Sequence, residues 1–235
     1  MNFDLGLSPA ELVEAVEARH SVRSYHADRP LAPEAMARIC DAIASLSAEV
    51  DGLTMQLVVN EPRAFGGRWA RYGIFKGVEN YIVISTRKGH DLDIKVGEQG
   101  EKIVLLAQHL GLNTCWVGLT YTKVPAAFSI PDDEKVRCVI AIGYGVDGAI
   151  HRHKIKAPEQ VSNIGSDYPD WFREGVRLAL LAPTAVNQQK FYFRLLDDGN
   201  TVRSTARFSL LGYTKIDLGI ARVHFAIGSG REAIL

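Results

Sequence analysis

A basic segment near the N-terminus, residues 19–25, has residue types that bind anions. It reads R-H-S-V-R-S-Y, with the guanidinium groups of Arg19 and Arg23 four residues apart and the hydroxyl of Ser21 between them. An arginine presents a planar fork of N–H donors that fits phosphate oxygens, and a serine adds one more donor. The segment is therefore a candidate phosphate-binding element, although a solvated, salt-bridged surface would also explain it.

A turn at residues 181–189 offers a different chemistry. It reads L-A-P-T-A-V-N-Q-Q, so a helix that stops near Pro183-Thr184 is followed by three amide side chains. Each amide carries both a hydrogen-bond donor and an acceptor, which suits the edge of a heterocycle. For this segment taken alone, an ordinary helix-to-strand turn is the alternative.

A third segment, residues 110–118, reads L-G-L-N-T-C-W-V-G. A helix that ends at Gly111 leads into a short extended stretch that ends at Gly118, and glycine lets the backbone approach a planar ligand closely. Cys115 would be the nucleophile if this segment were catalytic, but the sequence places no histidine beside it to activate the thiol. A free cysteine in an apolar run is expected in the core.

The chain as a whole is neutral, so the basic segments are local clusters of positive charge. The 235 residues include 27 Lys and Arg and 27 Asp and Glu, so the formal net charge is zero. Neither a nucleic acid nor an anionic membrane is therefore expected as the main partner. A second basic pair, Lys154 and Lys156, lies in the polar stretch 146–167. Two basic clusters on a neutral protein could meet at one phosphate, so a small-molecule ligand is expected.

The hydrophobic pattern predicts helices and strands without the regular alternation of a doubly wound fold. Ser8, Pro9 and Glu11 mark the start of the first helix, because they match a capping box with proline at the first helical position. Further helices are expected at 33–46, 97–110, 169–181 and 216–227, and strands at 53–59, 80–85, 114–118, 136–143 and 191–196. The expected fold class is α+β, with a β-sheet flanked by helices.

The order helix, turn, strand occurs twice, and the two copies align weakly. The helix that starts at Pro33 aligns without a gap on the helix that starts at Pro169. After a shorter spacer, residues 98–100 fall on residues 217–219, where both copies are expected to open a helix. Because any two helix–turn–strand units could align this well, the pattern makes internal duplication a hypothesis.

The cysteines and the absence of long apolar runs indicate the compartment. Cys40, Cys115 and Cys138 show neither a paired spacing nor a zinc-binding pattern, so no disulfide and no metal site is expected. This usage fits a reducing environment. The sequence has no signal-peptide pattern and no apolar run of about 18 residues, so a soluble, cytoplasmic protein is expected.

Taken together, the three segments strongly resemble the nitroreductase family of FMN enzymes, and the resemblance runs from about Glu11 to Gly230. One departure is large. Family members carry an A-P-S-x-x-N-x-Q turn soon after the R-S-x-R segment, whereas residues 46–51 here read L-S-A-E-V-D, a degraded form. The intact turn comes much later, in the second copy. The chain thus resembles a fused, tandem subgroup in which one chain imitates the family homodimer.

The resemblance implies which residues hold FMN. Arg19 and Ser21 would bind the phosphate with two lysines of the basic arm, and Arg23 would lie at the pyrimidine edge. The backbone N–H groups of Val117 and Gly118 would face N5 and O4. No catalytic side chain is implied, because the flavin carries the chemistry. The full implied set is Arg19, His20, Ser21, Arg23, Arg71, Tyr72, Trp116, Val117, Gly118, Lys154, Lys156, Pro183, Thr184 and Asn187.

The resemblance also implies how the chain is divided and what it does. Residues 8–150 would form the first nitroreductase-like copy, 151–167 a basic connecting arm, and 168–235 a second, truncated copy. Only one complete set of site residues is present, so one FMN per chain and a monomer are expected. The implied activity is hydride transfer from NAD(P)H to a nitroaromatic, a quinone or a similar acceptor. The alternatives are a non-catalytic FMN-binding or flavin-sensing protein, and a structural interaction domain with a decayed pocket.

Overall fold

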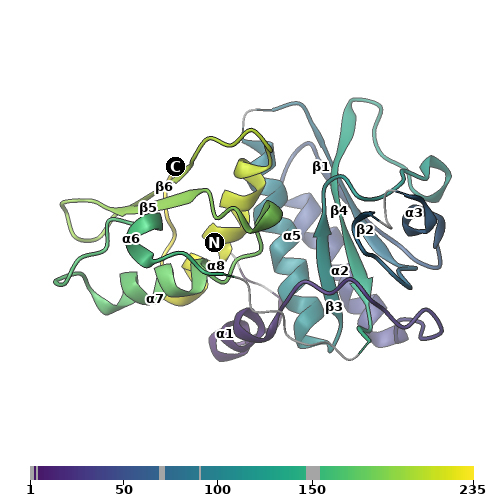
Figure 1. The fold of residues 1–235 in the computed structure, drawn as a ribbon, viewed down its shortest axis with the longest axis horizontal. Helices are drawn as coiled ribbons and strands as arrows, with labels where there is room; N and C mark the ends of the chain where they lie inside the picture. The colour runs from purple at the N-terminus through teal and green to yellow at the C-terminus, as the bar shows by residue number, and fades with distance from the viewer. Residues whose placement is uncertain (1–2, 4, 69–71, 90, 147–153) are drawn as a thin grey trace. The chain divides into compact units, whose positions relative to one another are not determined.

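The structure is a computed structural model, and it describes residues 3, 5–68, 72–89, 91–146 and 154–235 (Figure 1). Contacts between residues divide the chain into two compact units. The sheet unit contains residues 19–92 and 103–151, and the hairpin unit contains residues 1–18, 93–102 and 152–235. The expected copies are continuous stretches of sequence rather than contact units, and that division stays a prediction.

The sheet unit is built on four antiparallel strands that lie in the order β1, β2, β4, β3. Their bounds are β1 Leu53–Val58, β2 Tyr81–Arg87, β3 Asn113–Val117 and β4 Glu134–Gly143. The first six residues of β2 are all buried, and the apolar residues among them, 81–84, form the continuous run expected in the middle of a sheet. The amphipathic helix α2 (Pro33–Ala48) packs against β1 (Figure 1).

An aromatic cluster supports the loop that follows the short helix α3 (Arg63–Gly66). The ring of Phe65 meets the rings of Phe75 and Tyr81 edge to face, with centroids 5.1 and 5.9 Å apart. Such pairs add to the stability that comes from burying the rings. Both ends of the loop are therefore anchored in the core of the sheet unit.

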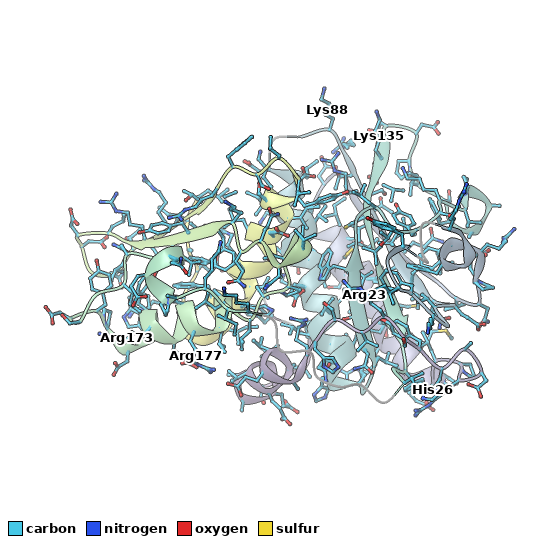
Figure 2. The ribbon with its side chains drawn as sticks, viewed as in Figure 1. Arg23, His26, Lys88, Lys135, Arg173 and Arg177 are labelled. Atoms are coloured by element: carbon cyan, nitrogen blue, oxygen red, sulfur yellow. The ribbon has the colours of Figure 1, made fainter. Side chains whose placement is uncertain are left out.

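The hairpin unit surrounds a second aromatic core. Its helices are α1 (Pro9–Ala18), α6 (Pro158–Val161), α7 (Asp170–Ala179) and α8 (Thr214–Ser229), and its strands are β5 (Phe191–Leu195) and β6 (Val202–Ala206). Phe172 of α7, Phe193 of β5 and Phe225 of α8 are fully buried and pack on one another, the last two stacked 4.5 Å apart. On α7, Arg173 donates to the Tyr168 carbonyl at 3.0 Å, and Arg177 pairs with Glu17 of α1 at 2.7 Å (Figure 2).

Helix α5 (Leu92–His109) crosses α8 at two glycines within the hairpin unit. A Cβ on Gly97 would lie 2.1 Å from the carbonyl oxygen of Ile216, and a Cβ on Gly219 would lie 2.1 Å from the carbonyl oxygen of Ile94. The contact is reciprocal, because each glycine is the sixth residue of its helix and each isoleucine is the third. Only glycine permits two helix backbones to approach this closely.

Buried charged groups accompany this crossing. The guanidinium of Arg222 on α8 donates to Glu98 Oε1 on α5 at 2.7 Å and to Ser204 Oγ on β6 at 2.7 Å. All three residues are buried. Separating Arg222 from Glu98 would leave an uncompensated buried charge, which is strongly unfavourable. The pair therefore favours the one alignment of α5, α8 and β6 in which these groups meet.

Most elements expected from the sequence are confirmed to within a few residues, and so is the α+β class. The capping box of the first helix is present, since Ser8 N–H donates to Glu11 Oε2 at 2.8 Å and Glu11 N–H donates to Ser8 Oγ at 3.3 Å. The start of α5 was predicted wrongly: it begins at Leu92, five residues before Gly97. Gly97 reads as a helix boundary in sequence, but tertiary packing requires it inside the helix.

The corrected start of α5 changes the alignment of the two copies. Neither segment opens a helix: residues 98–100 are the seventh to ninth residues of α5, and residues 217–219 are the fourth to sixth of α8. The reciprocal crossing instead relates Gly97 to Gly219. Across the described ranges, no helix combines the length and the apolar character needed to cross a membrane.

Candidate functional site

The R-H-S-V-R-S-Y segment lies beside β3 in the sheet unit. Ser21 forms a parallel bridge with Thr114, and Val22 N–H donates to the Thr114 carbonyl at 3.0 Å. On its other side, Lys76 N–H donates to the Arg23 carbonyl at 2.9 Å. The structure thus brings together the basic segment and the T-C-W-V-G strand, two of the three segments singled out from the sequence.

Arg23 is exposed on this extended segment (Figure 2). Its guanidinium carbon lies 5.9 Å from the centroid of the Phe75 ring, a distance typical of a weak cation–π contact. The described residues place no carboxylate against it. Arg23 is therefore a cation available to an anionic or electron-rich ligand.

Cys115 lies in the core behind this segment. Burial raises the pKa of its thiol, and this outweighs the opposing effects of Arg23, of a hydrogen bond with Ser21 and of Arg19. The thiolate is the reactive form of cysteine, so this thiol is protonated and unreactive at neutral pH. Its burial agrees with the expectation that Cys115 is a core residue.

The loop after α3 presents apolar side chains near the end of β3. A Cβ on Gly73 would lie 2.6 Å from Thr120 Oγ1, so the loop lies against the residues that follow Gly118. Tyr72 is 84% exposed, and Ile74 and Leu119 are exposed too. These side chains could cover a planar ligand. Arg71, the other residue predicted here, lies outside the described residues.

In the hairpin unit, the turn at residues 184–189 has a strained backbone. Val186, Asn187 and Gln189 have φ values of 46°, 54° and 45°, in the left-handed region. This conformation is unfavourable for a residue with a Cβ, and most of all for a β-branched one such as Val186. Strain of this kind persists only where the surroundings impose it, and it is concentrated at ligand-binding sites.

The basic arm holds this turn in place. The Lys154 carbonyl accepts hydrogen bonds from Asn187 Nδ2 at 2.8 Å and from Gln189 Nε2 at 3.0 Å. Lys156 Nζ donates to the carbonyls of Gln188 and Gln189, both at 2.8 Å. The structure thus brings Lys154, Lys156 and Asn187 together. The Asn187 amide is turned toward the arm, which indicates that it shapes the turn.

Lys156 lies in a positively charged environment. Its pKa is lowered, first by burial and then by the neighbouring charges of Lys190 and Arg207. Two of its three N–H groups are used on the turn, which leaves one donor for a ligand. An anion here would relieve the repulsion among the three cations.

Sequence reasoning missed Asp217, which lies beneath the turn and contacts Gln188 of the turn itself. Asp217, on α8, is only 3% exposed and accepts hydrogen bonds from Ala185 N–H at 2.9 Å and from Gln188 Nε2 at 2.7 Å. Burial raises the Asp217 pKa to about 6, and the two hydrogen bonds oppose the rise. The available signal was a lone acid within the apolar run I-D-L-G-I.

The predicted site residues therefore form two groups, one in each unit. The sheet unit carries Arg19, His20, Ser21, Arg23, Tyr72, Trp116, Val117 and Gly118, and the hairpin unit carries Lys154, Lys156, Pro183, Thr184 and Asn187. Within each group, hydrogen bonds or backbone pairing connect segments that are far apart in sequence. The role of each residue toward a flavin stays a prediction.

This fold, an antiparallel sheet in the order β1-β2-β4-β3 with packed helices, is that of nitroreductases. The structure of a protein from Thermotoga maritima, described as "a putative nitroreductase", superposes with a TM-score of 0.67, at 22% identity, over 92% of this chain and 82% of that chain. The model of the family described as "Putative TM nitroreductase" matches residues 11–229, almost the whole chain. The chain therefore belongs to this nitroreductase family.

Two shorter nitroreductases are also similar. The structure from Bacteroides fragilis, with bound FMN, is 20% identical and covers 63% of this chain and 95% of its own. The structure from Desulfovibrio desulfuricans, in complex with FMN, is 22% identical and covers 61% of this chain and 91% of its own. Both have a TM-score of 0.48. No curated protein matches this chain.

Proposed function

We propose that this chain is an FMN-dependent oxidoreductase that takes electrons from NAD(P)H and passes them to a nitroaromatic, a quinone or a similar acceptor. The bound flavin would supply the hydride chemistry. The observation that carries the proposal is the pairing of the R-H-S-V-R segment with β3, which leaves Arg23 exposed beside glycine-terminated backbone. Membership of the nitroreductase family supports it.

The donor set fits a phosphorylated flavin. Arg19 and Ser21 supply charge-assisted and neutral donors suited to a phosphate, and Lys154 and Lys156 supply further cations from the basic arm. Arg23 would stabilise negative charge at the pyrimidine edge, because a fixed cation there favours the reduced, anionic ring. The strained turn at 184–189 would line the ring and the ribityl chain.

The proposal includes an internal duplication, with residues 8–150 and 168–235 as the two copies. The reciprocal contact of Gly97 with Ile216 and of Gly219 with Ile94 supports it, because equivalent positions of two helices meet as they would across a dimer axis. The second copy would then replace a partner subunit. We expect one FMN per chain and a monomer.

A cytoplasmic location is part of the same proposal. Cys40, Cys115 and Cys138, all among the described residues, form no disulfide. Cysteines without disulfides are typical of reducing compartments, where thiols are kept reduced.

The spectrum of the purified protein tests the proposed function. A yellow protein that releases one FMN per chain on denaturation, and that bleaches on anaerobic addition of NADH or NADPH, would support it. Recovery of the colour on addition of a nitroaromatic or a quinone would identify the acceptor class. A flavin that binds but is not reduced by either nucleotide would favour the non-catalytic FMN-binding protein. Two flavins per chain would contradict the single-site proposal.

A further inference from the structure

The carboxylate of Asp217 connects α8 to the turn at 184–189. It lies in the first turn of α8 and accepts hydrogen bonds from Ala185 N–H and from Gln188 Nε2. Gln188 Nε2 also donates to the Gly212 carbonyl at 3.2 Å. The Asp217 carboxylate and the Gln188 amide together thus join the turn at 184–189, the loop before α8 and α8 itself.

The orientation of the Gln188 amide follows from these partners. Asp217 Oδ2 and the Gly212 carbonyl are both acceptors, so the amide nitrogen must face them. The amide oxygen, Oε1, is then buried with no hydrogen-bond partner among the described residues. An unpaired buried acceptor is unfavourable. This orientation of the Gln188 amide therefore costs stability, so a role other than stabilising the fold must account for it.

The strain of the turn supplies that explanation. Three residues of the turn, Val186, Asn187 and Gln189, are in the left-handed region, and Val186 is 78% exposed. Asp217 fixes the turn immediately before Val186, through Ala185, and immediately after Asn187, through Gln188. Without these bonds the strained residues would relax toward ordinary backbone angles.

We propose that Asp217 is a positioning residue for flavin binding, which holds the turn at 184–189 in its binding conformation through Ala185 and Gln188. This inference rests on the proposed function, because it takes the turn to be part of the FMN site. It assigns no contact between Asp217 and the cofactor.

The proposed duplication adds an independent observation. With Gly97 equivalent to Gly219, the position of Asp217 in α8 is that of Lys95 in α5. The first copy carries the degraded turn L-S-A-E-V-D, and it has a lysine where the second copy has the acid. A lysine cannot accept a hydrogen bond from a backbone N–H group. The copy with the intact turn therefore has the acid Asp217, and the copy with the degraded turn has no acid at the equivalent position.

Two variants test the inference, with FMN affinity and thermal stability as separate readouts. Asp217→Asn keeps the shape of the side chain but turns one acceptor into a donor that opposes Gln188 Nε2. Gln188→Leu removes the other half of the link. We expect each to weaken FMN binding at least tenfold at pH 7, well below the melting temperature. The loss of FMN affinity in the double variant should be smaller than the product of the losses in the two single variants, because both substitutions remove the same hydrogen-bonded link.

Asp198→Asn is the matched control. The Asp198 carboxylate also holds a turn, since it accepts N–H donors from Asn200 at 2.9 Å and from Thr201 at 2.8 Å. That turn joins β5 to β6 at the end of the hairpin away from Lys190. The variant should lower the melting temperature without changing the dissociation constant of FMN by more than about twofold.

The outcomes separate this inference from the proposed function. Wild-type protein that binds FMN, with Asp217→Asn and Gln188→Leu variants that bind it as tightly, would overturn the positioning role and leave the proposed function standing. A loss of affinity that occurs only with loss of the folded circular-dichroism spectrum would overturn the role as well. Wild-type protein that binds no FMN would overturn both. Weaker binding at unchanged or higher melting temperature would support the inference.

Discussion

Arg19 and Arg23 are four residues apart, yet the proposed site gives them different partners. We predict that Arg19→Ala weakens FMN binding about tenfold or more, because it removes charge-assisted hydrogen bonds to the phosphate of roughly 1.5–3 kcal/mol each. The same change should leave riboflavin binding almost unaffected, because riboflavin has no phosphate. Titrations of both flavins against the wild type and the variant measure the difference.

Arg23→Ala is the companion variant, and its effects should be distinct. It should weaken FMN and riboflavin by similar factors and lower the reduction potential of the bound flavin, since the anionic reduced ring would lose a fixed cation. A redox titration measures the potential. Equal losses of both flavins with Arg19→Ala, or an unchanged potential with Arg23→Ala, would reject these roles without affecting membership of the family.

The three cysteines should differ in reactivity. Cys40 is exposed, whereas Cys115 and Cys138 are buried, and burial raises the pKa of the Cys115 thiol. We predict that a thiol reagent at pH 8 labels Cys40 rapidly in the native protein and labels all three residues after denaturation. Labelled residues are identified by peptide mass spectrometry. Rapid labelling of Cys115 in the folded protein would contradict its assignment to the core.

Asp217 should make stability depend on pH. Its pKa is raised from 3.8 to about 6, so the folded state holds a proton more tightly than the unfolded state between those pH values. The contribution of this group to stability is present at low pH and is lost as the pH rises through about 6. Relative to wild type, Asp217→Asn should gain up to about 3 kcal/mol in unfolding free energy between pH 4 and pH 7.

Chemical denaturation of both proteins at several pH values measures this difference. The comparison cancels the titration of all other groups, because the two proteins share them. A difference that stays constant from pH 4 to pH 7, or that changes in favour of the wild type, would show that Asp217 is ionised in the folded protein over the whole range.

At the scale of elements, the crossing of α5 and α8 leaves no room for a side chain at Gly97 or Gly219. Gly97→Ala would place a methyl group against the Ile216 carbonyl, and Gly219→Ala would do the same against Ile94. We predict that each variant lowers the unfolding free energy by roughly 1–3 kcal/mol through overpacking. Because the contact is reciprocal, the two losses should be similar.

Gly66→Ala provides the control for this prediction. Gly66 is also helical, in α3, but a Cβ there would meet nothing within 4 Å. Its substitution should be neutral or should stabilise the protein by up to about 1 kcal/mol, through reduced entropy of the unfolded chain. Urea unfolding of the three variants measures the losses. Equal effects of Gly66→Ala and Gly97→Ala would show that the helices do not approach closely.

At the scale of the whole molecule, the proposed duplication predicts the assembly state. If the second copy takes the place of a partner subunit, the chain should be a monomer of 25.9 kDa that holds one FMN. Light scattering of the flavin-loaded protein, combined with a count of released flavin, measures both values. A dimer that loses its flavin when it is diluted to monomers would indicate a site that needs two chains.

The sequence by itself determined the class of the fold and singled out the segments of the proposed site. Hydrophobic runs of β2 and β4, the proline-started helix α2 and the capping box of α1 are local signals, and each was confirmed. The R-H-S-V-R and T-C-W-V-G segments were also recognisable, because arginine spacing and glycine positions are properties of the chain alone.

Only the tertiary structure decided how distant residues constrain one another. Gly97 looks like the start of a helix, and its place inside α5 follows from the approach of Gly219, 122 positions along the chain. Asp217 stands out in the sequence only as an acid within an apolar run, and its burial beneath the turn at 184–189 makes it an acceptor for Ala185 and Gln188. Local pattern cannot reveal either role, because both depend on which backbone groups of another element lie within hydrogen-bond or van der Waals distance.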